Sequence, residues 1–77
     1  MEKCLKDFNP GEEGQVKVIT ADGKIKRRMF DMGVTPGAVI KMRKLAPLGD
    51  PIEVTLRGYE LTLRKSEAEN IIMEVSK

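Results

Sequence analysis

Histidine and tryptophan are absent from this 77-residue chain, and Cys4 is its single cysteine. One cysteine allows no disulfide within the chain, which indicates a reducing compartment. Without histidine, metal sites built from His and Cys and acid–base catalysis by His are almost excluded within one chain. No apolar run approaches the roughly 20 residues that span a bilayer, and the opening "MEKCLKDF" lacks the apolar core of a signal peptide. We therefore expect a cytoplasmic protein that does not itself insert into a membrane.

Aromatic residues are scarce, and the balance of charge is nearly even. Of the three aromatic residues, Phe8 and Phe30 are expected in the core, so the stacking platform of a single-strand nucleic-acid binder is missing. Fourteen Lys and Arg against twelve Asp and Glu give a net charge of +2, too small to indicate nucleic-acid binding by itself. No nucleic-acid partner is expected.

The polar residues do not assemble into a catalytic or metal-binding motif. The oxygen donors Glu12, Glu13, Asp50 and Glu53 lack the spacing of a calcium loop, and ferrous iron usually prefers imidazole ligands as well. The single thiol has no base beside it in the sequence, and no nucleophile–base–orienter set can be assembled. We predict a protein that is not an enzyme and that has no cofactor and no metal ligands of its own.

Hydrophobic periodicity predicts one strand followed by one helix in the first half of the chain. Residues 15–20 alternate as a half-buried strand. Ile25, Met29 and Met32 then follow at helical spacing, with Phe30 beside them. The predicted helix begins at Asp22 or Gly23 and ends before a glycine at position 33. A turn at residues 35–37 follows it.

The second half of the chain alternates as strands. The residues predicted to face the core are Ala38, Ile40, Met42, Ile52, Val54, Leu56, Leu61 and Leu63. A type II′ hairpin is expected at Gly58-Tyr59, a capping box with Ser66 as its first residue at 66–69, and a last strand at 71–75. About five short antiparallel strands are too few for two sheets, so they are expected to curl into a small SH3-like barrel. We expect one mainly β domain over residues 1–77, with one inserted helix and a helical turn before the last strand.

Several motifs together resemble the ferrous iron transport protein A family, FeoA. They are a basic pair, Met-Phe-Asp-Met-Gly, Pro-Gly, "APLGDP", Gly-Tyr, Leu-Arg and Glu-Ala, and an N-terminal "LKDFNPGEEGQV". They fall at Arg27-Arg28, Met29 to Gly33, Pro36-Gly37, Ala46 to Pro51, Gly58-Tyr59, Leu63-Arg64 and Glu67-Ala68. The resemblance implies an SH3-like barrel that serves as a small cytosolic accessory of a ferrous iron uptake system. The implied partner is the membrane permease of that system, with its cytosolic GTP-binding domain.

The loop "APLGDP" raises a question of its own. Its prolines limit the unfolded chain, Gly49 permits a special conformation, and Asp50 is expected to bond its own backbone. Leu48 either folds inward as a plug or points outward as a contact. We predict that the loop is first a rigid corner and also a docking point, because loops on rigid scaffolds often carry recognition. The predicted partner-binding residues are Arg27, Arg28, Leu48, Gly49, Asp50, Pro51 and Tyr59.

Two alternatives to the adaptor remain open. A metal-responsive regulatory module would sense Fe(II) directly, and an SH3-like nucleic-acid-binding domain would use the basic helix face around Lys24 and Lys26. That face is equally well explained as the solvated side of an amphipathic helix. The sequence leaves the oligomeric state open, a monomer included.

Overall fold

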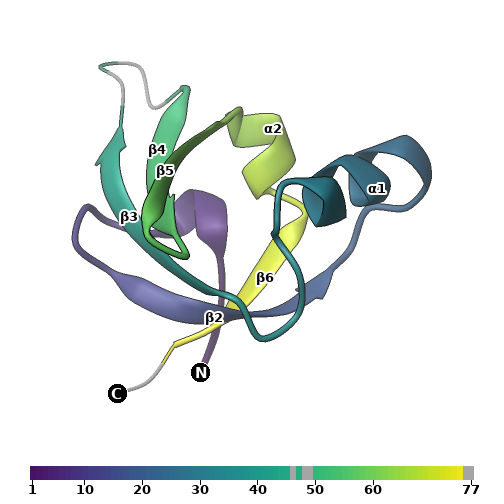
Figure 1. The fold of residues 1–77 in the computed structure, drawn as a ribbon. Helices are drawn as coiled ribbons and strands as arrows, with labels where there is room; N and C mark the ends of the chain where they lie inside the picture. Colours follow the sequence, from purple (N-terminus) through teal and green to yellow (C-terminus); the bar gives the residue numbers. More distant parts are fainter. Residues whose placement is uncertain (46, 48–49, 76–77) are drawn as a thin grey trace.

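Six strands and two short α-helices build the molecule (Figure 1). The computed structural model describes residues 1–45, 47 and 50–75. In chain order the elements are β1 (Glu2–Cys4), the 3₁₀-helix η1 (Leu5–Asp7), β2 (Glu13–Ile19), α1 (Gly23–Asp31), β3 (Val39–Leu45), β4 (Ile52–Leu56), β5 (Tyr59–Leu63), α2 (Lys65–Ala68) and β6 (Ile71–Glu74). Within the described residues, no helix has the length and apolarity needed to cross a membrane.

The strands form one antiparallel sheet in the order β1-β6-β2-β3-β4-β5. Strand β2 is shared between two neighbours: residues 13–15 pair with β3, and residues 15–19 pair with β6. Irregular register in the β2–β6 and β3–β4 pairs marks points where strands bend. Figure 1 shows the sheet curving around the core, with β2 sweeping beneath it. The mainly β fold with one inserted helix and a helical turn before the last strand is as predicted.

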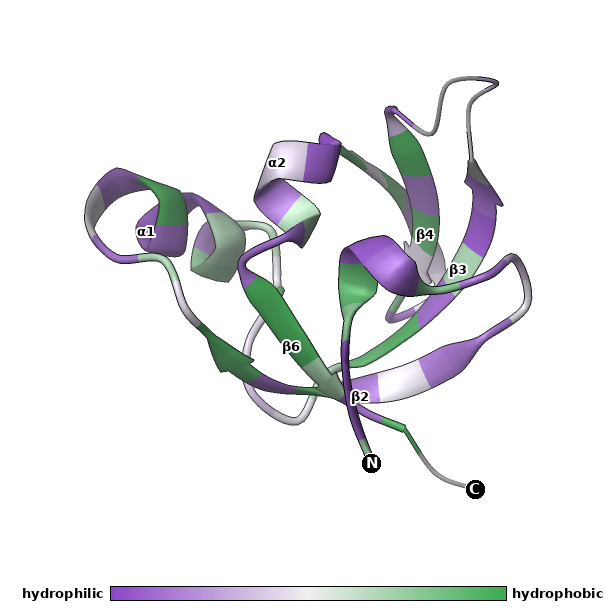
Figure 2. Ribbon diagram, turned by 180° about the vertical axis from the view of Figure 1, so that it is seen from behind, coloured by the Kyte–Doolittle hydropathy of each residue, from purple (hydrophilic) through white to green (hydrophobic). Residues whose placement is uncertain are grey.

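The core lies inside this curve and is formed by alternating strand residues. The fully buried side chains include those of Ile40, Met42, Ile52, Val54, Leu56, Leu63, Ile71 and Met73. Figure 2 shows alternating hydrophobic and hydrophilic bands along β4, whereas β6 is hydrophobic along most of its length. Strands β2 and β6 approach so closely at Gly14 that a Cβ there would lie 2.7 Å from the carbonyl oxygen of Glu74. No other residue type fits that crossing without a shift of the backbone.

The N-terminal segment contributes more structure than the sequence indicated. Leu5 and Phe8 are both buried and anchor this segment, and Phe8 was predicted to lie in the core. Residues 2–4 in addition form β1, which pairs with β6 and is a sixth strand that was not expected. Residues 2–4 contain a single apolar residue, Cys4, so the segment is too short to show the alternation that predicts a strand. The strand conformation of these residues is instead stabilised by pairing with β6 at the edge of the sheet.

Helix α1 has the predicted limits, but it buries less than predicted. Asp22 precedes it in extended conformation, and Gly33 follows its last turn with φ +91°. Met29 is fully buried, whereas Ile25 is 46% exposed and Phe30 42% exposed. The prediction that Phe30 belongs to the core is therefore wrong. The helix lies beside the edge of the curved sheet (Figure 2), so only a narrow stripe of it meets the core.

Two local predictions about the second half of the chain are also wrong in position. Leu56 pairs with Tyr59, so the hairpin residues are Arg57 and Gly58, with φ of 52° and 86°. Positive φ at both residues indicates a type I′ turn instead of a type II′ turn at Gly58-Tyr59. The capping residue of α2 is Arg64, two residues before the predicted Ser66, which lies inside the helix.

Candidate partner-binding site

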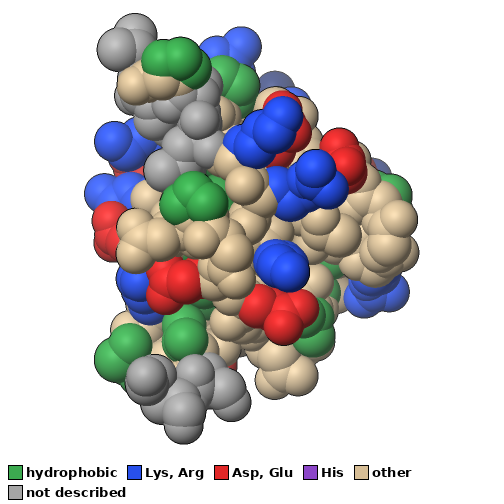
Figure 3. Space-filling view, turned by 90° about the vertical axis from the view of Figure 1, so that its left-hand side faces the viewer, with side chains coloured by type: hydrophobic (Ala, Val, Ile, Leu, Met, Phe, Trp, Pro, Cys, Tyr) green, Lys and Arg blue, Asp and Glu red, His purple; other side chains and the backbone are tan. Residues whose placement is uncertain are grey.

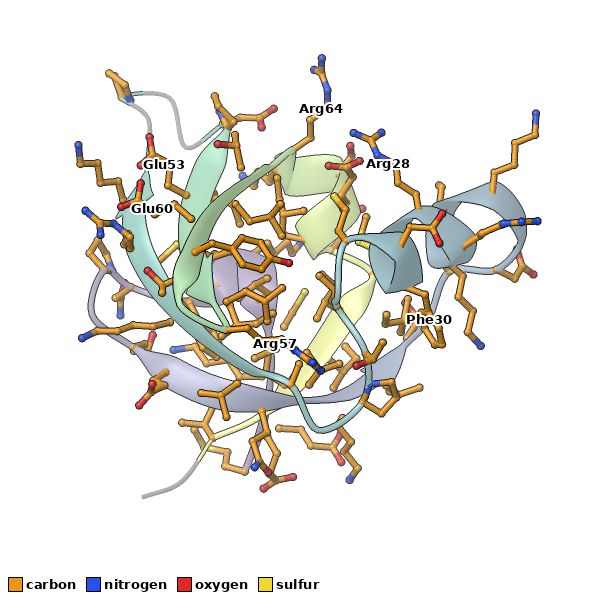
Figure 4. All side chains as sticks on the ribbon, viewed as in Figure 1. Arg28, Phe30, Glu53, Arg57, Glu60 and Arg64 are labelled. Carbon is orange, nitrogen blue, oxygen red and sulfur yellow. The ribbon has the colours of Figure 1, made fainter. Side chains whose placement is uncertain are left out.

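One hollow on the surface brings together three of the residues predicted from the sequence. Its volume is about 340 Å³. Four segments line it: α1, the chain entering β4, the end of β5 and the start of α2. The lining residues are Arg28, Asp50, Pro51, Thr62, Arg64 and Glu67, and we call this hollow the Arg28–Arg64 cleft. Figure 4 shows Arg28 and Arg64 extending to the same side of the molecule from α1 and from the start of α2.

Glu67 holds the inner wall of the cleft. Its Oε1 accepts a hydrogen bond of 2.9 Å from the backbone N–H of Arg64, where α2 begins. Its Oε2 lies 3.0 Å from Nη1 of Arg28, so the same carboxylate joins α2 to α1. The Glu67 side chain is only 11% exposed, while that of Arg28 is 64% exposed. The acidic group is therefore enclosed, and the guanidinium faces solvent.

Asp50 ties the end of the β3–β4 connection to α2. Its Oδ1 accepts a hydrogen bond of 2.8 Å from the backbone N–H of Lys65. This bond reaches a segment 15 residues further along the chain, whereas the sequence predicted a bond from Asp50 to its own local backbone. Pro51 follows at the rim, directly before β4. Leu48 and Gly49 lie outside the described residues, so the question of where Leu48 points falls outside them too.

The two arginines of the predicted basic pair differ in position. Arg28 lines the cleft, whereas Arg27 does not contribute to its lining. Both are exposed on α1. Lys26 lies on the same helix. Its Nζ is 5.9 Å from the centre of the exposed Phe30 ring, so the lysine side chain covers part of that ring. The predicted basic face of α1 is thus exposed along its length, and Arg28 is its member in the cleft.

Tyr59 lies away from the cleft and holds the end of α1. Its hydroxyl donates a hydrogen bond of 2.5 Å to the carbonyl oxygen of Met32, and a Cβ at Gly33 would lie 3.0 Å from that hydroxyl oxygen. Next to it, Arg57 Nη2 donates to Thr35 Oγ1 at 3.4 Å. The tip of the β4–β5 hairpin therefore fastens the chain that leaves α1. Tyr59 as a residue is still 46% exposed.

Three residues of the cleft were not predicted as site residues: Thr62, Arg64 and Glu67. Glu67 does belong to a helix-capping pattern, as the sequence indicated, but that pattern begins at Arg64 and not at the predicted Ser66. Thr62 carries no signal beyond its place in a strand. Arg64 formed part of the Leu-Arg motif that resembles the FeoA pattern. Its position opposite Arg28 depends on how the barrel brings α1 and α2 together.

The remaining charged surface is mixed. Figure 3 shows Lys and Arg side chains interspersed with Asp and Glu side chains over the face that it displays. Away from the cleft, a hydrogen bond from Lys3 and another from the backbone N–H of Asn9 lower the pKa of Glu12. Hydrogen bonding to the N-terminal ammonium lowers the pKa of Glu74. Among the described residues, no three His, Cys, Asp or Glu side chains form a group that could hold a metal ion.

Comparisons with known proteins agree with the resemblance of the motifs. A family model described as the FeoA domain matches residues 3–75. The chain is 27% identical over 71 residues to an "Fe(2+) transport protein A/Fe(2+) transporter FeoB fusion protein" of Porphyromonas gingivalis. That match includes 92% of this chain but only 8% of the length of the relative.

Two solved structures have the same fold. A FeoA-like protein from Clostridium acetobutylicum is 39% identical, with a TM-score of 0.90 over 99% of this chain and 88% of that one. Stenotrophomonas maltophilia FeoA, described as a prokaryotic SH3 domain protein and complexed with zinc, is 24% identical. Its TM-score is 0.79 over 96% of this chain and 89% of that one. The predicted SH3-like barrel is confirmed by this likeness.

Proposed function

Because this chain belongs to the FeoA family, we propose that it is a cytoplasmic accessory protein of a ferrous iron uptake system. It binds the cytosolic GTP-binding part of the membrane permease and modulates Fe(II) transport. It has no catalytic activity of its own in this proposal, and it acts through its surface.

The fused relative is the observation that supports this proposal most strongly. In the Porphyromonas gingivalis protein, a segment similar to this chain shares a polypeptide with a segment described as the Fe(2+) transporter FeoB. Linking two domains that bind each other raises their effective concentration and turns the encounter into an intramolecular event. A separate chain with the same fold lacks this advantage, so it needs a surface that binds the transporter tightly enough without fusion. The exposed arginines of the Arg28–Arg64 cleft are suited to that role, because arginine is enriched at the centres of interfaces.

The test is binding to the full-length cognate transporter in nanodiscs, measured with the nucleotide-free, GDP-bound and GTP-analogue-bound transporter. Saturable binding in at least one state is expected, together with a changed rate of Fe(II) uptake when the chain is added to transporter proteoliposomes. Absence of binding in all three states would refute the proposal.

Two further measurements separate the alternative functions. A direct Fe(II) sensor predicts a thermal shift of the isolated chain when Fe(II) is added under anaerobic conditions. A nucleic-acid-binding domain predicts affinity for nucleic acid that falls steeply with salt. If the chain is an adaptor, neither the thermal shift with Fe(II) nor the salt-dependent binding of nucleic acid is expected.

A further inference from the structure

The Arg28–Arg64 cleft is rich in hydrogen-bond donors that the described residues leave available. Among the ion pairs and side-chain hydrogen bonds between described residues, the Arg64 guanidinium takes part in none. Arg28 uses Nη1 toward Glu67, while a guanidinium offers five N–H donors in a fixed plane. Both arginine side chains are exposed at the mouth of the cleft.

The two acidic residues of the cleft are largely occupied by backbone donors. Glu67 accepts from the backbone N–H of Arg64 and pairs with Arg28, and one oxygen of Asp50 accepts from the backbone N–H of Lys65. Only the second oxygen of Asp50 has no partner among the described residues. The cleft therefore presents two guanidinium groups together with one acceptor oxygen.

This combination selects a class of ligand. A dianionic phosphate group offers only acceptor oxygens, and the carboxylates of Asp50 and Glu67 would repel its two charges more strongly than the single charge of a peptide carboxylate. An extended peptide with an Asp or Glu side chain offers a carboxylate for the arginines and a main-chain N–H for Asp50. Planar carboxylate and planar guanidinium also match for paired hydrogen bonds. Pro51 adds an apolar contact at the rim.

From this chemistry we infer that the Arg28–Arg64 cleft binds an acidic peptide segment of the transporter, with its carboxylate held between Arg28 and Arg64. This inference rests on the proposed function and adds to it the docking surface and the chemistry of the partner segment. Arg64 is the principal anchor, because Arg28 already shares its charge with Glu67.

The test uses the full chain and the full-length cognate transporter in nanodiscs. Arg64→Ala is expected to weaken binding roughly tenfold, as for an arginine at the centre of an interface. Arg64→Glu should weaken it further, and Arg64→Lys should restore only part of the affinity because lysine cannot form the paired bonds. Lys44→Ala is the matched control: it removes the same charge from an exposed position on β3 that does not line the cleft.

Each other outcome leads to a definite conclusion. If the wild-type chain does not bind the transporter, the proposed function fails and this inference fails with it. If the wild type binds and Arg64→Ala binds equally well, only the inference is overturned. Equal losses for Arg64→Ala and Lys44→Ala would show general electrostatic attraction and also overturn it. Empty nanodiscs of the same anionic lipid composition form the last control. If they bind the chain as tightly and Arg64→Ala abolishes that binding, the cleft recognises lipid phosphate instead of a peptide.

Discussion

Glu67 makes two interactions of different strength, and substitution can separate them. Its Oε1 caps the start of α2 through the backbone N–H of Arg64, and its Oε2 pairs with Arg28. Glu67→Gln keeps a carbonyl oxygen that can accept the capping bond but removes the charge. Glu67→Ala removes both interactions. Comparing the two variants therefore shows which interaction holds the wall of the cleft.

The expected magnitudes favour the capping bond. Arg28 is 64% exposed, so its ion pair is screened and contributes only about 0.2–1 kcal/mol. The capping bond has a charged acceptor, and losing such a bond at a partly buried site costs about 1.5–3 kcal/mol. Glu67→Ala should thus destabilise the fold by about 2 kcal/mol, which for a domain of this size lowers Tm by roughly 10 °C. Glu67→Gln should cost about 0.5 kcal/mol.

Urea unfolding followed by circular dichroism measures both values, with Arg28→Ala completing a double-mutant cycle. Glu67→Gln and the Arg28→Ala/Glu67→Gln double variant should have nearly equal stability, because the pair is already broken in each. If Glu67→Gln is as damaging as Glu67→Ala, the ion pair dominates and the reasoning is refuted.

Three other substitutions test the fold. Gly33→Ala places a side chain at φ +91° and 3.0 Å from a tyrosine hydroxyl, so thermal unfolding should show a loss of about 1–2 kcal/mol; unchanged Tm would contradict this. Phe8→Ala should cost about 3–5 kcal/mol, whereas Phe30→Ala should change stability by less than about 1 kcal/mol; equal effects would mean that the burial of these rings is misassigned. The hydrogen bond from Lys3 lowers the pKa of Glu12 in the folded state. Ionised Glu12 therefore stabilises the fold fully above pH 4.5, and this stabilisation is lost as the pH falls through the folded pKa. Acid titration should therefore show a smaller loss of stability for Glu12→Gln than for the wild type.

The elements that could be predicted from the sequence are those whose local pattern agrees with their surroundings. The strands after position 37 carry apolar residues at alternate positions toward the buried face of the curved sheet, and all of them were predicted. Gly33 marked the end of α1 because its positive φ is a local requirement. Phe30 was wrongly predicted as a core residue because a hydrophobic residue can lie on either side of a helix's apolar stripe. Only the position of α1 beside the sheet leaves its ring exposed.

Half of the residues that line the cleft were predicted from the sequence. Arg28, Asp50 and Pro51 were named from motifs, and the structure brings them into one cleft. Tyr59 was named with them, but it contacts the end of α1 instead. Arg64 and its neighbours in the cleft could not be selected from the sequence. Their place opposite α1 results from long-range packing, which no local pattern encodes.

The proposed docking of this chain on the ferrous iron transporter is tested most directly by one measurement. Isotopically labelled chain is titrated with the full-length transporter in nanodiscs while the intensity of each backbone amide signal is recorded. Docking through the cleft predicts the largest losses at Arg28, Asp50 and Arg64, with weaker effects around Val39, which is exposed on β3 and does not line the cleft. Uniform intensities in every nucleotide state, or losses centred on Val39, would contradict the account.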